Sequence, residues 1–268
     1  MELFDIIALA VIQGITEFLP VSSSGHLALW PLLTGSADQG VTMDVAVHLG
    51  TLIAVCIFFR REVGQVLRGL LRMLRGDFLN AESYLVMLLI IATIPAIVVG
   101  LALKLGDVMP LLRTIEVIGW ATLIGGLVLG WADTRPGPRL DAGHWTIRDA
   151  IWMGLAQAVA LIPGTSRSGI TMTMARALGF DRTAAARLAL LMAIPVILAA
   201  GTLETAGVIK DGNFTLGSEL ILGVLLSCIA ALATLKIMLS MFASTWTMLP
   251  FVIYRLILGS VLLWIAYS

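Results

Sequence analysis

Charged side chains are scarce in this chain. Asp, Glu, Lys and Arg make up 13% of its 268 residues, while 59% are hydrophobic. Soluble domains average about 25% charged and about 45–50% apolar residues. A soluble fold of this composition would expose large apolar patches to water. The scarcity of charge therefore excludes an ordinary soluble domain and favours an integral membrane protein, for which lipid is the solvent.

Other absences narrow the class further. Acidic and basic residues are balanced at 17 each, so no excess of positive charge indicates a nucleic-acid partner. The two cysteines, Cys56 and Cys228, both lie in apolar runs, which favours packing over a disulfide or a metal site. Residues 1–5 contain no Lys or Arg, unlike the start of a cleaved signal peptide. We therefore expect no nucleic-acid partner and no disulfide.

Long apolar segments are present instead. A spanning helix needs roughly 17–25 residues. Six segments reach or approach that length: 45–59, 85–103, 115–132, 188–203, 220–235 and 249–266. Four apolar stretches are too short to cross: 6–12, 27–33, 150–162 and 170–178. The short stretches flank polar breaks at 20–25 and 163–169, which predicts two re-entrant hairpins whose irregular backbone borders protein or a water-filled cavity.

The two polar breaks match each other in sequence. A shift of 144 residues aligns Gln13 with Gln157, Ser22 with Ser166, Ser24 with Ser168, and Gly25 with Gly169. These matches predict an internal repeat, with halves 1–140 and 141–268 inside a single membrane domain, 1–268. Each half has one hairpin and three transmembrane helices, an odd number of crossings, so the second half is inverted relative to the first. Paired broken helices of this kind build a central site where the repeats meet.

The distribution of Lys and Arg predicts the orientation. Twelve lie in alternate connections, at 60–75, 133–148, 176–187 and 236, whereas only Lys104, Arg113 and Lys210 lie in the others. Cytoplasmic loops are the richer in Lys and Arg, so both termini should lie outside. The first hairpin then enters from the outer side and the second from the cytoplasm. We expect the site to open outward.

The first break carries candidate reactive groups. Gln13 and Glu17 are four residues apart and share a helix face. The hydroxyl groups and the imidazole that follow belong to Ser22, Ser23, Ser24 and His26. A carboxylate at membrane depth is costly and indicates a function and a partner. Together these residues are candidates for nucleophile, general base and general acid.

The second break has the features of an anion site. Arg167 presents a planar fork of donors that fits phosphate or carboxylate. Free backbone amides at the start of a helix add to such a site. The accompanying substrate-binding candidates are Gly164, Thr165, Ser166, Ser168 and Thr171. An anion clamp beside candidate nucleophiles favours phosphoryl transfer or hydrolysis.

Structural interpretations compete with this one. Ser and Gly in membrane helices often serve close packing. Glu17 and Arg167 would also form a purely structural ion pair, and His26 would serve equally as a helix cap. An anion carrier would need the arginine and its serines but no nucleophile. His48 lies in a predicted span without polar neighbours in sequence, so we expect a packing role or a place in a dimer surface.

The motifs resemble those of the undecaprenyl-diphosphatase family, the bacitracin-resistance proteins of bacteria. A Gln-x-x-x-Glu helix at 13–17 runs into Pro-x-Ser-Ser-x-Gly-His at 20–26, and Pro-Gly-x-Ser-Arg-Ser-x-x-Thr follows at 163–171. Together with length and span number, the resemblance covers essentially the whole chain. One departure is Gln13, where many relatives carry Glu. If a second carboxylate helps to hold a metal there, Glu17 carries more of that role here.

The resemblance implies an enzyme of the bacterial inner membrane, and the distribution of Lys and Arg predicts that its site faces the periplasm. It would hydrolyse undecaprenyl diphosphate, a C55 isoprenyl diphosphate lipid, to the monophosphate and inorganic phosphate. That reaction recycles the lipid carrier for cell-wall synthesis and confers bacitracin resistance. An isoprenyl-phosphate flippase or transporter is the alternative. A homodimer is an open expectation.

The resemblance also implies catalytic roles and a cofactor. Ser23 is the first choice of nucleophile, with His26 as its base or as proton donor to the leaving phosphate. Direct attack by water, activated by Glu17 or His26, stays open. Arg167 would hold the transferred phosphoryl group. A divalent cation, Mg or Ca, is implied, with Glu17 as its protein ligand.

Overall fold

The computed structural model describes residues 2–36, 39–135, 139–210 and 217–268, and within these ranges the regular structure is helical apart from an isolated bridge between Leu140 and Phe180. Six helices in these described ranges are long and apolar enough to cross a membrane. They are α3 (Gly40–Phe58), α5 (Ala81–Leu105), α7 (Ile115–Thr134), α10 (Arg182–Lys210), α11 (Ser218–Ala243) and α12 (Leu249–Tyr267). Each overlaps one predicted span, so the all-helical membrane class is confirmed.

Four shorter helices fall where the sequence predicts them: α1 (Leu3–Thr16), α2 (Ser23–Thr34), α8 (Ile147–Val159) and α9 (Arg167–Ala177). Ser22 and Ser166 immediately precede α2 and α9, with φ of 77° and 68°. Left-handed φ is uncommon outside glycine, and such strain is concentrated at functional sites. The two breaks therefore share a strained backbone geometry at matched positions.

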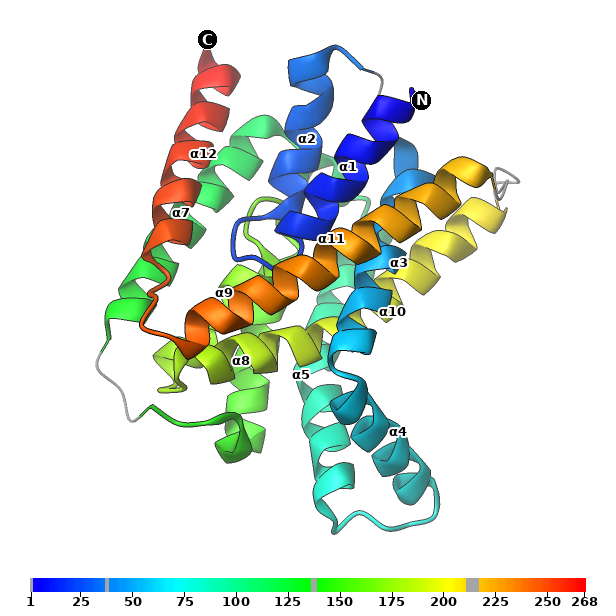
Figure 1. The fold of residues 1–268 in the computed structure, drawn as a ribbon, viewed down its shortest axis with the longest axis vertical. Helices are drawn as coiled ribbons and strands as arrows, with labels where there is room; N and C mark the ends of the chain where they lie inside the picture. Colours follow the sequence, from blue (N-terminus) through cyan, green and yellow to red (C-terminus); the bar gives the residue numbers. More distant parts are fainter. Residues whose placement is uncertain (1, 37–38, 136–138, 211–216) are drawn as a thin grey trace.

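Helices from distant parts of the chain pack together. α1 packs against α11, α8 against α5, and α7 against α12. A Cβ on Gly14 would lie 2.6 Å from the carbonyl oxygen of Ser227, and one on Gly154 would lie 2.7 Å from that of Ala92. Small residues let membrane helices approach this closely. Both termini lie at one end of the molecule, and the connection between α4 (Arg60–Leu74) and α5 lies at the other (Figure 1).

The outer faces of the spans are apolar. Rows of exposed side chains four residues apart run along two spans: Ile90, Ile94 and Val98 on α5, and Ile221, Leu225 and Ile229 on α11. Residues at this spacing share one face of a helix. Such faces are unfavourable in water and match the hydrocarbon region of a bilayer.

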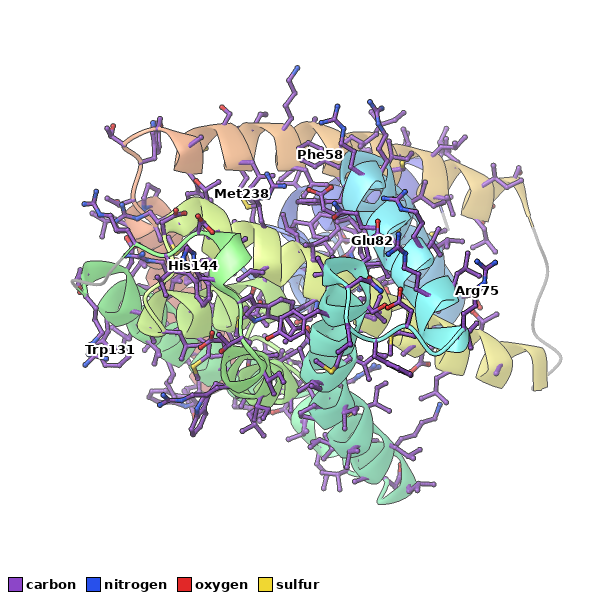
Figure 2. All side chains as sticks on the ribbon, turned by 90° about the horizontal axis from the view of Figure 1, so that it is seen from below. Phe58, Arg75, Glu82, Trp131, His144 and Met238 are labelled. Atoms are coloured by element: carbon purple, nitrogen blue, oxygen red, sulfur yellow. The ribbon has the colours of Figure 1, made fainter. Side chains whose placement is uncertain are left out.

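The segment 60–75 differs from the sequence-based prediction, which treated it as a basic connection. It forms helix α4 instead, because its apolar residues recur every three or four positions. Glu82, at the start of α5, holds this helix in place: its Oε1 accepts a hydrogen bond from Arg68 Nε at 2.8 Å, and its Oε2 lies 3.2 Å from Arg72 Nε. Figure 2 shows Glu82 alongside α4. Counting arginines for orientation does not reveal this periodicity.

Candidate active site

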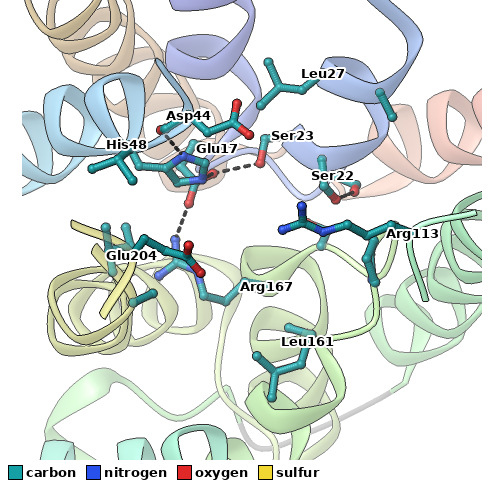
Figure 3. Close-up of a pocket in the computed structure, with 18 of the residues that line it drawn as sticks. Glu17, Ser22, Ser23, Leu27, Asp44, His48, Arg113, Leu161, Arg167 and Glu204 are labelled. Atoms are coloured by element: carbon teal, nitrogen blue, oxygen red, sulfur yellow. Dashed lines mark hydrogen bonds and ion pairs between the residues drawn. The ribbon is translucent and has the colours of Figure 1, made fainter. Parts of the chain in front are cut away.

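Glu17 is the hub of the site. Its Oε2 accepts hydrogen bonds from Gln13 Nε2 at 2.9 Å and from Ser23 Oγ at 2.8 Å. Its Oε1 accepts one from Arg167 Nη2 at 2.9 Å. Glu17 directly follows α1, Ser23 begins α2 and Arg167 begins α9, so the two breaks converge on one carboxylate (Figure 3). The shared helix face of Gln13 and Glu17 is confirmed, and so is the pairing of Glu17 with Arg167.

The Arg167 guanidinium is only half used. Nη2 binds Glu17, but Nη1 is buried without a hydrogen-bond partner in the described ranges. Leaving a buried charged donor unsatisfied is costly. Arg167 also lines a pocket, so a residue with unsatisfied donors borders a space large enough for an anionic ligand.

Serines join the two breaks. The N–H of Gly164 donates to Ser24 Oγ at 3.2 Å, and Ser168 Oγ donates to the carbonyl of Leu19 at 2.8 Å. Within each break a pair of hydroxyls lies in contact, Ser22 with Ser24 at 3.1 Å and Ser166 with Ser168 at 3.2 Å. These bonds fix the position of one break against the other before any ligand binds.

A pocket of about 500 Å³ lies over this junction. Of the predicted site residues it is lined by Glu17, Ser22, Ser23, Ser24, Ser166 and Arg167. Polar residues that the sequence analysis did not assign to the site also line it: Gln39, Asp44, His48, Arg113 and Glu204. Apolar walls come from residues such as Leu27, Ile118, Leu161, Val196 and Ile197. A polar floor with apolar walls suits an amphiphile with an anionic head.

Several predicted binding residues support the turn rather than the pocket. The lining does not include Gln13, His26, Gly164, Thr165, Ser168 or Thr171. The hydroxyl of Thr171 is fully buried and donates to the carbonyl of Arg167 at 2.7 Å. The amide of Gly164 is already bonded to Ser24. The Thr171 hydroxyl and the Gly164 amide therefore stabilise the shape of the second break. The sequence analysis had assigned both residues to substrate binding.

The prediction for His48 is wrong. Its Nε2 lies 3.6 Å from Glu17 Oε2, and its Nδ1 lies 2.7 Å from the carbonyl oxygen of Asp44. The residues directly beside it in sequence are apolar, which concealed this environment, although Asp44 lies one turn earlier on the same helix. The contact arises because α3 packs against α1. The sequence around His48 does not indicate which helix α3 packs against.

His26 does not contact Ser23 as its predicted role as the base for Ser23 requires, because both of its ring nitrogens have other partners. His26 Nδ1 lies 2.7 Å from the carbonyl oxygen of Ser22, and Nε2 lies 2.6 Å from Tyr254 Oη on α12. The imidazole stacks on the Tyr254 ring with centroids 5.6 Å apart. Both ring nitrogens are thus engaged away from Ser23, whose hydroxyl is bonded to Glu17 instead.

Arg255 is a site residue that the sequence analysis missed. Its side chain is fully buried in α12 and donates only to backbone carbonyls. The acceptors belong to Pro20, Ala121, Thr122, Gly164 and Thr165, at 2.9–3.3 Å. It therefore binds both breaks and α7 at once. The available signal was a charge alone in the middle of an apolar span, which is costly without a purpose.

The donors around Glu17 are few for a metal ion. In the described part of the chain no three His, Cys, Asp or Glu side chains are grouped closely enough to hold one. Glu17 is already bonded to Arg167, Ser23 and Gln13. The site therefore does not fit a resident metal held by protein ligands alone. It fits only a cation that brings most of its ligands with the substrate.

The fold and the site define a class. This is a multi-span helical membrane protein with a polar pocket, lined by Glu17, Ser23 and Arg167, where the two breaks come together. The family follows from comparison with known proteins. The family model described as bacitracin resistance protein BacA matches residues 6–261. This chain belongs to that family, as its motifs predict.

Close relatives cover the entire chain. A protein of Jannaschia sp. (strain CCS1) is 52% identical over 268 residues, and one of Dinoroseobacter shibae is 51% identical, with 100% of each chain covered. A protein of Roseobacter denitrificans is 48% identical with the same coverage. All three bear the name undecaprenyl-diphosphatase.

Proposed function

We propose that this protein hydrolyses undecaprenyl diphosphate to undecaprenyl phosphate and inorganic phosphate. The observation that carries the proposal is the hydrogen bonding of the Arg167 guanidinium. Its Nη2 donates to Glu17, whereas its buried Nη1 has no partner in the part of the chain described. Ser23 is bonded to the same carboxylate and faces the same pocket. The names of the relatives support the same substrate.

The proposed chemistry follows the contacts. Ser23 transfers its proton to Glu17 while Oγ attacks the terminal phosphorus. The bond from that phosphorus to the bridging oxygen breaks, Glu17 passes its proton to that oxygen, and the C55 monophosphate leaves. Water then cleaves the phosphoseryl bond, releases inorganic phosphate and restores Ser23. Arg167 donates to the phosphoryl oxygens, where negative charge must be stabilised.

Direct attack by water is the alternative route to the same products. Glu17 would then take a proton from water, and Ser23 would hydrogen-bond the phosphate. His26 is assigned a positioning role in either route, because its ring links the carbonyl of Ser22 to Tyr254. A divalent cation, Mg or Ca, belongs to the proposal. Glu17 would hold it together with substrate phosphates, a common arrangement for Mg²⁺, and it would supply positive charge to the diphosphate.

The proposed architecture is an inverted repeat of two re-entrant hairpins with three spans each. Matched backbone strain at Ser22 and Ser166 supports it. So does the burial of Gln13 and Gln157, since the Oε1 atom of each has no hydrogen-bond partner among the described residues. The packing of α1 on α11 repeats that of α8 on α5, as exchange of the two halves requires.

The cellular setting is part of the proposal. The enzyme would act in the bacterial inner membrane, with its pocket open to the periplasm. There it would regenerate the lipid carrier for cell-wall synthesis and confer bacitracin resistance. A homodimer is compatible with this function.

The test is phosphate release from C55 diphosphate by the purified protein in detergent with a divalent cation. We expect release by the wild-type protein and its loss in Arg167→Ala. An isoprenyl-phosphate flippase is the second candidate, since broken helices around a central site are also a transporter design. Detergent removes the two compartments that transport requires. Lipid binding without phosphate release would therefore favour the flippase and contradict the enzyme.

A further inference from the structure

Arg113 is a second arginine at the pocket. It follows the short helix α6 (Met109–Leu112) and precedes α7, and its side chain is exposed. Figure 3 shows its guanidinium reaching into the pocket from the side opposite His48 and Glu204, toward the space between Ser23 and Arg167. Across the described ranges, no hydrogen bond or ion pair involves this guanidinium.

The two arginines differ in their surroundings. Arg167 is fixed by Glu17 and lies beside Ser23 at the floor of the pocket. Arg113 lines the same pocket, whose apolar walls include Leu27 and Ile118. A diphosphate ester has two phosphate groups, of which the terminal one reacts and the proximal one carries the lipid. With the reacting group at Ser23, the proximal group lies on the side of the apolar wall.

We propose that Arg113 binds the lipid-proximal phosphate, so that the pocket distinguishes a diphosphate from a monophosphate. The inference rests on the proposed function and assigns the second half of the substrate's head group. A guanidinium offers a fork of donors to phosphate oxygens. It would also stabilise negative charge on the proximal phosphate as it leaves. Product release is favoured in turn, because each product carries one phosphate and loses the contact that held the other.

The experiment compares Arg113→Gln with the wild-type protein in detergent. The probes are methylenediphosphonate, which resists hydrolysis, and inorganic phosphate, with binding measured by calorimetry. Losing one charge-assisted hydrogen bond should weaken diphosphonate binding about tenfold or more. Phosphate binding at Arg167 should change much less. The KM for C55 diphosphate should rise in parallel, and Arg113→Lys should recover part of the loss.

Arg61→Gln is the matched control, because Arg61 is an exposed arginine on α4 that does not line the pocket. It should leave both affinities unchanged. Equal diphosphonate affinity in Arg113→Gln and the wild-type protein would overturn the inference. An equal loss for both probes, or no diphosphonate binding by the wild-type protein, would overturn it too. Failure of the proposed function is a separate result, because it appears as absent phosphate release by the wild-type enzyme.

Discussion

Ser23 Oγ donates a hydrogen bond to Glu17 Oε2 at 2.8 Å, so the candidate nucleophile and its base are in contact before substrate arrives. An unactivated serine is a poor nucleophile, and a neighbouring base remedies that. His26, at hydrogen-bond distance from Tyr254 and the Ser22 carbonyl oxygen, has no such contact. The base in the proposed mechanism is therefore the carboxylate.

A covalent intermediate is the first prediction. Substrate labelled in its terminal phosphate should transfer label to the peptide that contains Ser23, because Oγ attacks that phosphorus. Rapid quenching followed by peptide mapping is the measurement. Ser24→Ala is the control. The Ser24 hydroxyl is bonded to the Gly164 amide and should not accept the phosphoryl group, so this variant should still be labelled. Unlabelled peptide together with substantial activity in Ser23→Ala would favour direct attack by water.

Arg167 should be indispensable. Replacement by Ala removes the clamp on the phosphoryl group, and we expect a fall in kcat/KM on the order of a hundredfold or more. Arg167→Lys should recover only part of this, because an ammonium group cannot pair with Glu17 and phosphate through separate arms of a fork. Steady-state phosphate release measures both. Full activity of the Lys variant would contradict the divided role of the guanidinium.

Glu17 and Gln13 should contribute unequally. Glu17→Gln removes the base and the partner of Arg167, so activity should be lost. Gln13→Ala removes one donor to Glu17 from outside the pocket lining and should be milder. Gln13→Glu should be tolerated. Assays across a series of Mg²⁺ concentrations provide the comparison, and equal inactivation by Gln13→Ala would place Gln13 in the reaction itself.

Arg255 should matter chiefly for stability. Arg255→Met leaves buried carbonyls from both breaks and α7 without donors, at about 1–3 kcal/mol for each unsatisfied group. We expect a clearly lower unfolding temperature in detergent, with loss of activity as the breaks separate. Arg255→Lys should recover little of the lost stability. The single ammonium nitrogen of lysine cannot reach carbonyls of both breaks and of α7 at the same time. Wild-type stability in Arg255→Met would show that these bonds are dispensable.

Orientation is testable by labelling. In a background lacking Cys56 and Cys228, a cysteine at Ser36 should react with an impermeant reagent from outside the cell. A cysteine at Leu79, which is fully exposed between α4 and α5, should react only after the membrane is opened. The reverse pattern would invert the proposed topology and turn the pocket toward the cytoplasm.

The spans and breaks were accessible from the sequence because their signals are local. Hydropathy over a helix length marked all six spans, and short apolar stretches beside 20–25 and 163–169 marked the four half-length helices. The costs of burying Glu17 and Arg167 predicted that each needs a partner. The amphipathic period of α4 is local as well, and counting its arginines alone concealed it.

What only the tertiary structure decided is which side chains share the pocket. His48, Arg113 and Glu204 come from separate helices or connections and share a pocket with Glu17 only because those elements pack around it. The same holds for Tyr254, which engages His26, and for Arg255, which binds both breaks. A residue's type and its neighbours along the chain determine its helix and its depth in the membrane. Its partner across the bundle depends on how helices far apart in sequence dock, and here close approach at positions such as Gly14 and Gly154 permits that docking.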